Sequence, residues 1–194
     1  MNTVRNIITN ILMAFYQPFW FSLLACILFM FLVLYAREHG WKQSFGIWWN
    51  AFKKEKTFRK QFFFAWVVIM ILFRTLLNRN IWTNPLVDVI GPWRVYSANG
   101  VLNTDIIENT IMMIPFSFCL FWCYDETFLK KHHLFYVSFQ GLKYAFCFSL
   151  TIETLQLVLF LGTFQISDLF FNTLGGLIGG FLYFIYYQMI HRRK

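Results

Sequence analysis

The stretch LFFNTLGGLIGGFLYFIYYQMI, residues 169–190, decides the class of fold for this chain. It contains no Asp, Glu, Lys or Arg, and the basic sequence HRRK follows it directly. A helix needs roughly 20 predominantly apolar residues to cross the hydrocarbon core of a bilayer. The stretch therefore predicts a membrane-spanning helix.

The composition of the whole chain also indicates a membrane protein. Of its 194 residues 58% are hydrophobic and only 13% are charged, whereas soluble domains are nearer to about 25% charged. The net charge of +8 does not indicate nucleic-acid binding, because the basic residues gather beside apolar runs, as they do in membrane proteins. The four cysteines lie inside apolar runs without zinc-type spacing, so no metal and no cofactor is expected.

Five apolar runs are long enough to span a bilayer. We expect an all-α fold, a polytopic transmembrane helical bundle formed as one domain over residues 1–194. The predicted spans are residues 19–36, 61–77, 106–124, 134–161 and 169–190.

The distribution of Lys and Arg predicts the orientation, since these residues concentrate in cytoplasmic loops. The segment 37–60 carries seven of them, the segment GTFQISD at 162–168 carries none, and the chain ends in HRRK. We therefore expect the N-terminus outside and the C-terminus in the cytoplasm.

Two further segments are predicted to be short amphipathic helices at the membrane surface. In WKQSFGIWWNAFKK, residues 41–54, the aromatic side chains recur at helical spacing opposite the lysines, which is typical of interfacial helices. Packing of this helix on protein is the alternative. Residues 4–15 form the second, and Pro18 is expected to open the first span.

Polar side chains inside the predicted spans are the candidates for a functional site. Those of the outer half are Arg74, Asn109, Glu153, Gln156, Asp168 and Asn172, with Glu108 beside Asn109. Nothing comparable marks the inner half, where the histidines are interpreted as solvated interface residues. The long outer segment 78–104 is a lid, a binding element or a passive connector.

Glu153 has three interpretations. It lies eight residues before Leu161, hence roughly 12 Å below the outer surface, where a charge requires a partner. It pairs with Arg74 and braces the bundle, or it acts as a general acid or base, or it binds a ligand. The glycines of residues 175–180 are interpreted as a packing stripe against the preceding span.

These residues also resemble a known family. The segment ETLQLVLFLGTFQISDLFFNTLGGLIGG, residues 153–180, resembles the C-terminal signature of VanZ-like membrane proteins, and NTIMMIP, residues 109–115, resembles an upstream element of that family. The sequence departs from the pattern at Gly162, where many relatives carry Arg, at Gln165 and Ser167, where many carry Asp, and at Ser117. These departures predict a different ligand or affinity.

The resemblance implies a multi-pass protein of the bacterial plasma membrane, and its namesake is an accessory factor for teicoplanin resistance in Gram-positive bacteria. The leading hypothesis is an outer pocket that engages a membrane lipid, a lipid-linked cell-wall precursor or a lipoglycopeptide. The alternative is an intramembrane enzyme with Glu153 and Asp168 as acid and base. A small transporter is a third hypothesis, for which the inner half offers no visible polar path. The sequence does not define the oligomeric state.

Overall fold

The computed structural model describes residues 2–35, 40–77, 84–94, 96 and 104–191. Most side chains of residues 2–21 and those of residues 35, 41 and 42 lie outside the described set, which includes the predicted contacts of Val4, Phe15 and Trp41. So do the basic tail 192–194 and the parts 78–83, 95 and 97–103 of the predicted outer segment.

The described chain is helical and has the element order α1(Asn2–Tyr35), α2(Trp41–Lys54), α3(Lys56–Leu72), η1(Phe73–Leu77), α4(Asp105–Phe128), α5(Leu134–Leu159) and α6(Ile166–His191). Among the described residues, four helices are long and apolar enough to cross a membrane: Lys56–Leu77, Asp105–Phe128, Leu134–Leu159 and Ile166–His191. The apolar helix Ser22–Leu34 lies within the remaining predicted span. The predicted helical membrane bundle is therefore confirmed.

The helix α1 differs from the prediction at Pro18. A surface helix was expected to end there, but α1 continues without interruption from Asn2 to Tyr35. Proline inside a helix removes one backbone hydrogen bond, whereas a helix end in apolar surroundings leaves up to four carbonyls without a partner. Continuing the helix is therefore the less costly arrangement.

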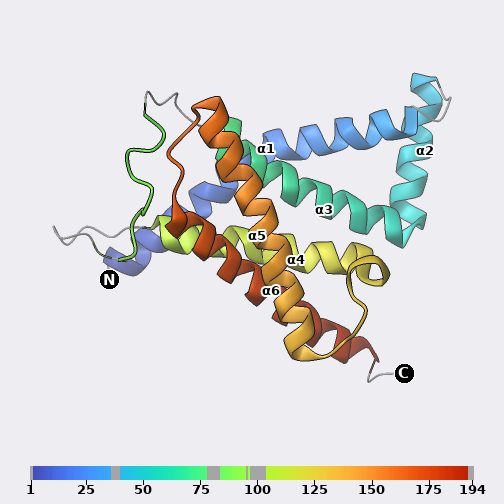
Figure 1. The fold of residues 1–194 in the computed structure, drawn as a ribbon. Coiled ribbons are helices and arrows are strands. Elements are labelled where there is room, and N and C mark those ends of the chain that lie inside the picture. Colours follow the sequence, from blue (N-terminus) through green and yellow to red (C-terminus); the bar gives the residue numbers. More distant parts are fainter. Residues whose placement is uncertain (1, 36–39, 78–83, 95, 97–103, 192–194) are drawn as a thin grey trace.

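The bundle has two packed parts that meet along α3. Helices α4, α5 and α6 form one part, around a core that includes Phe121, Val137, Ala145 and Ile152. Helices α1, α2 and α3 form the other, around Cys26, Trp48 and Phe62 among others. In Figure 1, α2 runs across the ends of α1 and α3, as expected of an interfacial helix.

Helix α2 combines both interpretations of its sequence. Phe45 and Trp49 are exposed, but Trp48 is buried against Phe58 and Phe62 of α3. The Nζ atom of Lys53 lies 4.7 Å from the centre of the Trp49 ring. One part of the aromatic face therefore packs on protein, and another part is left open to the membrane surface.

The glycines of α6 pack against two helices at once. A Cβ atom at Gly176 or Gly180 would collide with Ala145 or Val137 of α5, and one at Gly175 or Gly179 would collide with Thr110 or Ile114 of α4. The predicted contact with the preceding span is present, and the second contact, with α4, was not foreseen. This double contact holds α4, α5 and α6 together at backbone distance.

Candidate functional site

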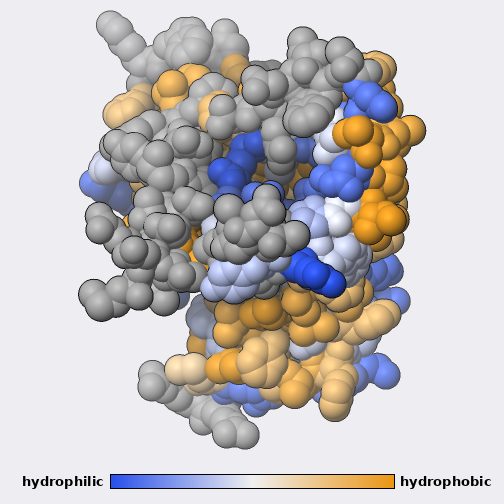
Figure 2. Space-filling view, turned by 90° about the vertical axis from the view of Figure 1, so that its left-hand side faces the viewer, coloured by the Kyte–Doolittle hydropathy of each residue, from blue (hydrophilic) through white to orange (hydrophobic). Residues whose placement is uncertain are grey.

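The six side chains predicted as a site all lie at one end of the bundle. This end comprises η1, the first turns of α4 and α6, the last turns of α5, and the segments 84–94 and 160–165. We call it the Glu153 end. Figure 2 faces it and shows hydrophilic residues gathered around a recess, with hydrophobic residues on the flank below.

Arg74 forms an ion pair with Glu108 of α4. The Glu108 side chain is only 7% exposed, whereas that of Arg74 is 27% exposed. Arg74 thus has a carboxylate partner on α4, and its pairing with Glu153 stays a prediction. Glu108, an ionisable residue that the sequence places at the start of the predicted third span, is the carboxylate that Arg74 neutralises.

Glu153 of α5 is buried, with 2% of its surface exposed. Its side chain is hydrogen-bonded to a residue on the other side of the α5–α6 turn. Its Oε2 atom accepts a hydrogen bond of 3.0 Å from the backbone N–H of Gln165. The chain can return so closely because α5 ends at Phe160, whose φ of 56° and ψ of 34° terminate the helix in the left-handed region. The carboxylate therefore lies directly beneath the turn.

Gln156 connects α5 to the π-helical turn η1. Its Nε2 atom donates a hydrogen bond of 2.7 Å to the backbone carbonyl of Thr75. A π-helical turn shifts the backbone hydrogen-bond register, and here a carbonyl on that turn accepts from a side chain. Gln156 is buried, so this bond fixes the position of η1, and with it Arg74, relative to α5.

The remaining predicted residues come from α4 and α6. Asn172 is buried and donates a hydrogen bond of 2.9 Å to the Ser149 hydroxyl of α5. Asp168 is half-buried in the first turn of α6. Asn109 is half-buried beside Glu108. Among its described residues, the Glu153 end therefore contains five acidic side chains and two arginines: Asp88, Asp105, Glu108, Glu153, Asp168, Arg74 and Arg94.

The segment 84–94 caps the start of α6. The carbonyls of Pro85, Val89 and Ile90 accept hydrogen bonds of 2.8–3.2 Å from the amides of Phe164, Ile166 and Ser167. Gly91 has a φ of +68°, and a Cβ atom there would collide with the Ser167 side chain. The described part of this segment is therefore neither a free lid nor a loose connector, because its backbone completes the N-terminus of α6.

An apolar cavity of about 230 Å³ lies at the same end, on the outside of α6. Its lining includes Trp93, Phe146, Ile166, Leu169 and Phe170. Ile166 and Leu169 flank Ser167 and Asp168 in the sequence. A wholly apolar cavity thus adjoins the polar residues that begin α6.

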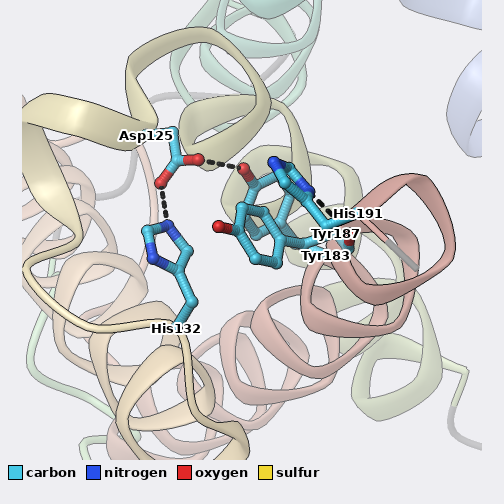
Figure 3. A network of polar contacts seen from close by, with 5 residues as sticks. All are labelled: Asp125, His132, Tyr183, Tyr187 and His191. Carbon is cyan, nitrogen blue, oxygen red and sulfur yellow. Dashed lines mark hydrogen bonds and ion pairs between the residues drawn. The ribbon is translucent and has the colours of Figure 1, made fainter. Parts of the chain in front are cut away.

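A second polar cluster lies at the other end of the bundle, which we call the Asp125 end (the last turns of α4 and α6, the segment 129–133 and the start of α3). Asp125 accepts hydrogen bonds from His132 Nε2 at 2.6 Å and from the Tyr183 hydroxyl at 2.8 Å. The rings of His132, Tyr187 and His191 stack in sequence, with centroid distances of 4.1 and 3.9 Å (Figure 3).

This cluster corrects the expectation that the inner half carries nothing comparable. The predicted third span stops at Tyr124, but α4 continues to Phe128 and brings Asp125 into the bundle. His132 pairs with Asp125 instead of being only solvated. One feature of the sequence indicates that Tyr183 faces the bundle. Tyr183 lies eleven residues after Asn172, which is about three helical turns, so the two side chains share one face of α6.

A family model described as VanZ/LLP1 matches residues 1–187 of the chain. The chain belongs to the VanZ/LLP1 family. No curated protein and no solved structure matches it. The resemblance drawn from residues 153–180 is therefore confirmed, and the match extends over nearly the whole chain.

The structure describes the positions at which the sequence was expected to depart from the VanZ-like pattern. Ser117 Oγ donates a hydrogen bond of 3.3 Å to the carbonyl of Gly141, between α4 and α5. Gly162 is buried, with the Gln156 amide 3.8 Å from where its Cβ would lie. The Gln165 side chain donates to Asp88 of the capping segment at 3.4 Å. The departures at Gly162 and Gln165 thus lie at the turn above Glu153 and Gln156.

Within the described residues, no group of three His, Cys, Asp or Glu side chains could hold a metal ion. The polar side chains at the Glu153 end are carboxylates, amides, hydroxyls and guanidinium groups. Such groups bind hydroxyls, amides and ammonium groups by hydrogen bonds, and carboxylates also transfer protons.

Proposed function

We propose that this VanZ-like protein serves the cell envelope from the bacterial plasma membrane, where its Glu153 end binds the polar part of an amphipathic envelope molecule. The candidate molecules are a lipid, a lipid-linked cell-wall precursor and a lipoglycopeptide. Binding of this kind would contribute to teicoplanin resistance. The observation that carries the proposal is the buried carboxylate of Glu153, 2% exposed, in a membrane bundle.

A buried carboxylate in a membrane protein is costly and marks a functional site by default. Bracing explains the neighbouring Glu108, because Arg74 neutralises it. Glu153 accepts a hydrogen bond from the backbone N–H of Gln165 across the α5–α6 turn. We infer that its carboxylate also acts toward a bound molecule, because it lies at the end of the bundle where the polar side chains predicted as a site gather.

The apolar cavity beside the start of α6 supports an amphipathic partner. It is lined by Trp93, Phe146 and Phe170 and adjoins Asp168 in the first turn of α6. An acyl chain in this cavity would hold the attached polar group near the recess of the Glu153 end. A purely polar solute would gain nothing from the cavity.

Glycopeptide susceptibility in a Gram-positive host tests the proposal. We expect Glu153→Gln, Asp168→Asn and Asn172→Ala each to lower the teicoplanin concentration tolerated to that of cells without the protein. Glu55→Gln, at the exposed α2–α3 junction, is the matched control and should keep full resistance. Equal amounts of folded protein are verified by size-exclusion chromatography. Unchanged resistance in all three variants would refute the proposal.

Comparison of membrane lipids separates binding from catalysis. Glu153 and Asp168 come from consecutive helices and could act as acid and base on a lipid-linked substrate. In that case a lipid species should appear with the wild-type protein and disappear with Glu153→Gln. If the lipid profile is unchanged while resistance depends on Glu153, the site binds without catalysis.

A further inference from the structure

Two cavities of opposite character meet at the Asp125 end. One, of about 380 Å³, is lined by polar side chains that include Thr57, Lys60, Asp125, Glu126 and Thr127. The other, of about 310 Å³, is a mainly apolar crevice between α1, α3 and α4. Tyr124 lines both cavities.

One continuous stripe of α3 joins the two cavities. Thr57 and Lys60 line the polar cavity, and Gln61, Phe64, Ala65 and Val68 line the apolar crevice. These residues follow the spacing i, i+3, i+4, i+7, i+8 and i+11, which places them on one helix face. From Lys60 to Val68 the stripe descends roughly 12 Å along the helix axis.

The backbone of α4 bends where the cavities meet. Tyr124 has a φ of −129° and a ψ of 37°, outside the helical region, within an otherwise helical segment. Its ring packs edge-on against Phe64 at a centroid distance of 5.9 Å. The bend therefore sets the last turn of α4, with Asp125 and Glu126, beside the first turns of α3.

The depth of each cavity matches a layer of the bilayer. Thr57 and Lys60 lie in the first turns of α3, and Glu126 and Thr127 lie in the last turn of α4, at the level of lipid headgroups. Phe64, Ala65 and Val68 lie deeper, at the level of acyl chains. Phe29 and Val33 of α1 close the crevice on the side away from α4.

The polar cavity carries both signs of charge. The Lys60 ammonium lies 5.5 Å from the centre of the Trp122 ring, and Thr57 and Thr127 line the same cavity. Asp125 already accepts hydrogen bonds from His132 and Tyr183, whereas Glu126 is exposed at the cavity. Lys60 and the threonines suit a phosphate, and Glu126 suits an ammonium group.

We propose that this groove binds one phospholipid with a primary-amine headgroup, a phosphatidylethanolamine-type lipid. Lys60 contacts its phosphate, Glu126 contacts its ammonium group, and an acyl chain fills the crevice between α1, α3 and α4. A choline headgroup has no N–H to donate to Glu126, and a glycerol headgroup brings a net negative charge toward two carboxylates. The site is separate from the Glu153 end and does not depend on its function.

Native mass spectrometry of the full-length protein tests this proposal. The probes are dioleoyl phosphatidylethanolamine, the matching phosphatidylcholine and phosphatidylglycerol, and soluble glycerophosphoethanolamine, which has the headgroup without chains. We expect the wild-type protein to retain one phosphatidylethanolamine molecule, with at least about tenfold weaker binding of the other two lipids. That difference corresponds to about 1.4 kcal/mol.

Variants assign the two halves of the groove. Lys60→Gln and Glu126→Gln should each weaken phosphatidylethanolamine binding about tenfold, since each removes a charge-assisted contact. Ala65→Leu and Val68→Trp, which fill the crevice, should weaken binding of the lipid but not of glycerophosphoethanolamine. Lys131→Gln and Glu55→Gln change exposed charges that line neither cavity and should have no effect.

The proposal fails if phosphatidylcholine or phosphatidylglycerol binds as well as phosphatidylethanolamine. It also fails if the controls weaken binding as much as Lys60→Gln and Glu126→Gln do, or if no lipid is retained by wild-type protein that melts cooperatively. Equal binding of glycerophosphoethanolamine and the lipid would refute the role of the crevice. The melting temperature of each variant identifies any loss that comes from misfolding.

Discussion

At the scale of single residues, the two buried carboxylates of the Glu153 end, Glu108 and Glu153, differ in the contacts that the structure gives them. Glu108 is neutralised by Arg74, while Glu153 accepts a hydrogen bond from the backbone N–H of Gln165. A carboxylate with a cation beside it contributes to stability as half of an ion pair. The two residues should therefore respond differently to substitution, Glu108 mainly in stability and Glu153 mainly in function.

The Arg74–Glu108 pair should respond asymmetrically to the loss of each partner. Arg74→Gln leaves a carboxylate of 7% exposure without its cation and should lower the free energy of unfolding by about 3 kcal/mol. Glu108→Gln leaves Arg74, which is 27% exposed and can turn toward water, so a loss of about 1 kcal/mol is expected.

Denaturant titration in mixed micelles measures these free energies. The double variant should be more stable than the sum of the single losses predicts, because it leaves no unpaired charge. Arg94→Gln, at an exposed position, serves as control and should change little. Equal losses for the two single variants would contradict the asymmetry.

At the scale of elements, α6 packs closely against α4 and α5 because four of its glycines leave no room for a Cβ atom. Gly175 and Gly179 face the backbone of α4, and Gly176 and Gly180 face α5. Without these glycines the helices could not approach so closely, and van der Waals contact is the main attraction between helices in lipid. The same glycines align Asn172 with Ser149 one turn above them.

Alanine substitutions should therefore have opposite effects on α6 and on α2. Gly175→Ala should destabilise the protein by about 2 kcal/mol or more, because the new methyl group meets the backbone carbonyl of Thr110. Gly46→Ala is the matched control, since nothing lies within 4 Å of its Cβ position. That change should stabilise α2 by up to about 1 kcal/mol through helix propensity.

A second variant distinguishes steric collision from other effects. Gly176→Ala collides with the Ala145 methyl group, so adding Ala145→Gly should restore part of the lost stability. The same Ala145→Gly should not rescue Gly175→Ala, which meets α4 instead. Apparent melting temperatures in detergent measure both cases, and rescue of both variants to the same extent would argue against local collision.

At the scale of the whole molecule, the two ends are chemically distinct. The Glu153 end holds buried carboxylates and the Arg74–Glu108 ion pair beside a capping segment, and the Asp125 end holds the Asp125–His132–Tyr183 network and the lipid groove proposed above. The sidedness expected from Lys and Arg places the Glu153 end outside and the Asp125 end in the cytoplasm.

Cysteine labelling of intact cells tests this orientation. After Cys26, Cys119, Cys123 and Cys147 have been replaced by serine or alanine, Thr163→Cys should react with a membrane-impermeant maleimide. Lys131→Cys, at the opposite end, should react only after the cells are opened. Both positions lie in turns between helices, so the two variants control for each other. The reverse pattern would invert the predicted orientation.

The sequence by itself determined the solvent, the helical class and the family. In a bilayer an apolar run of roughly 20 residues forms a helix, because a helix pairs its backbone N–H and C=O groups internally and unpaired groups in hydrocarbon cost several kcal/mol each. The motif of residues 153–180 gave the family, and the polar residues of that motif do gather at one end of the bundle. Periodicity also placed the glycine stripe on the correct face of α6.

Only the tertiary structure decided which groups are partners. Arg74 of η1 pairs with Glu108 of α4, a partner that the sequence pattern did not indicate. Asp125 joins His132 and Tyr183 because α4 extends past its apolar run. The rotation and the length of a helix in a bundle follow from its packing against several neighbours together. The spacing of residues in the sequence shows which side chains share a helix face, but it does not show which residues of other helices that face contacts.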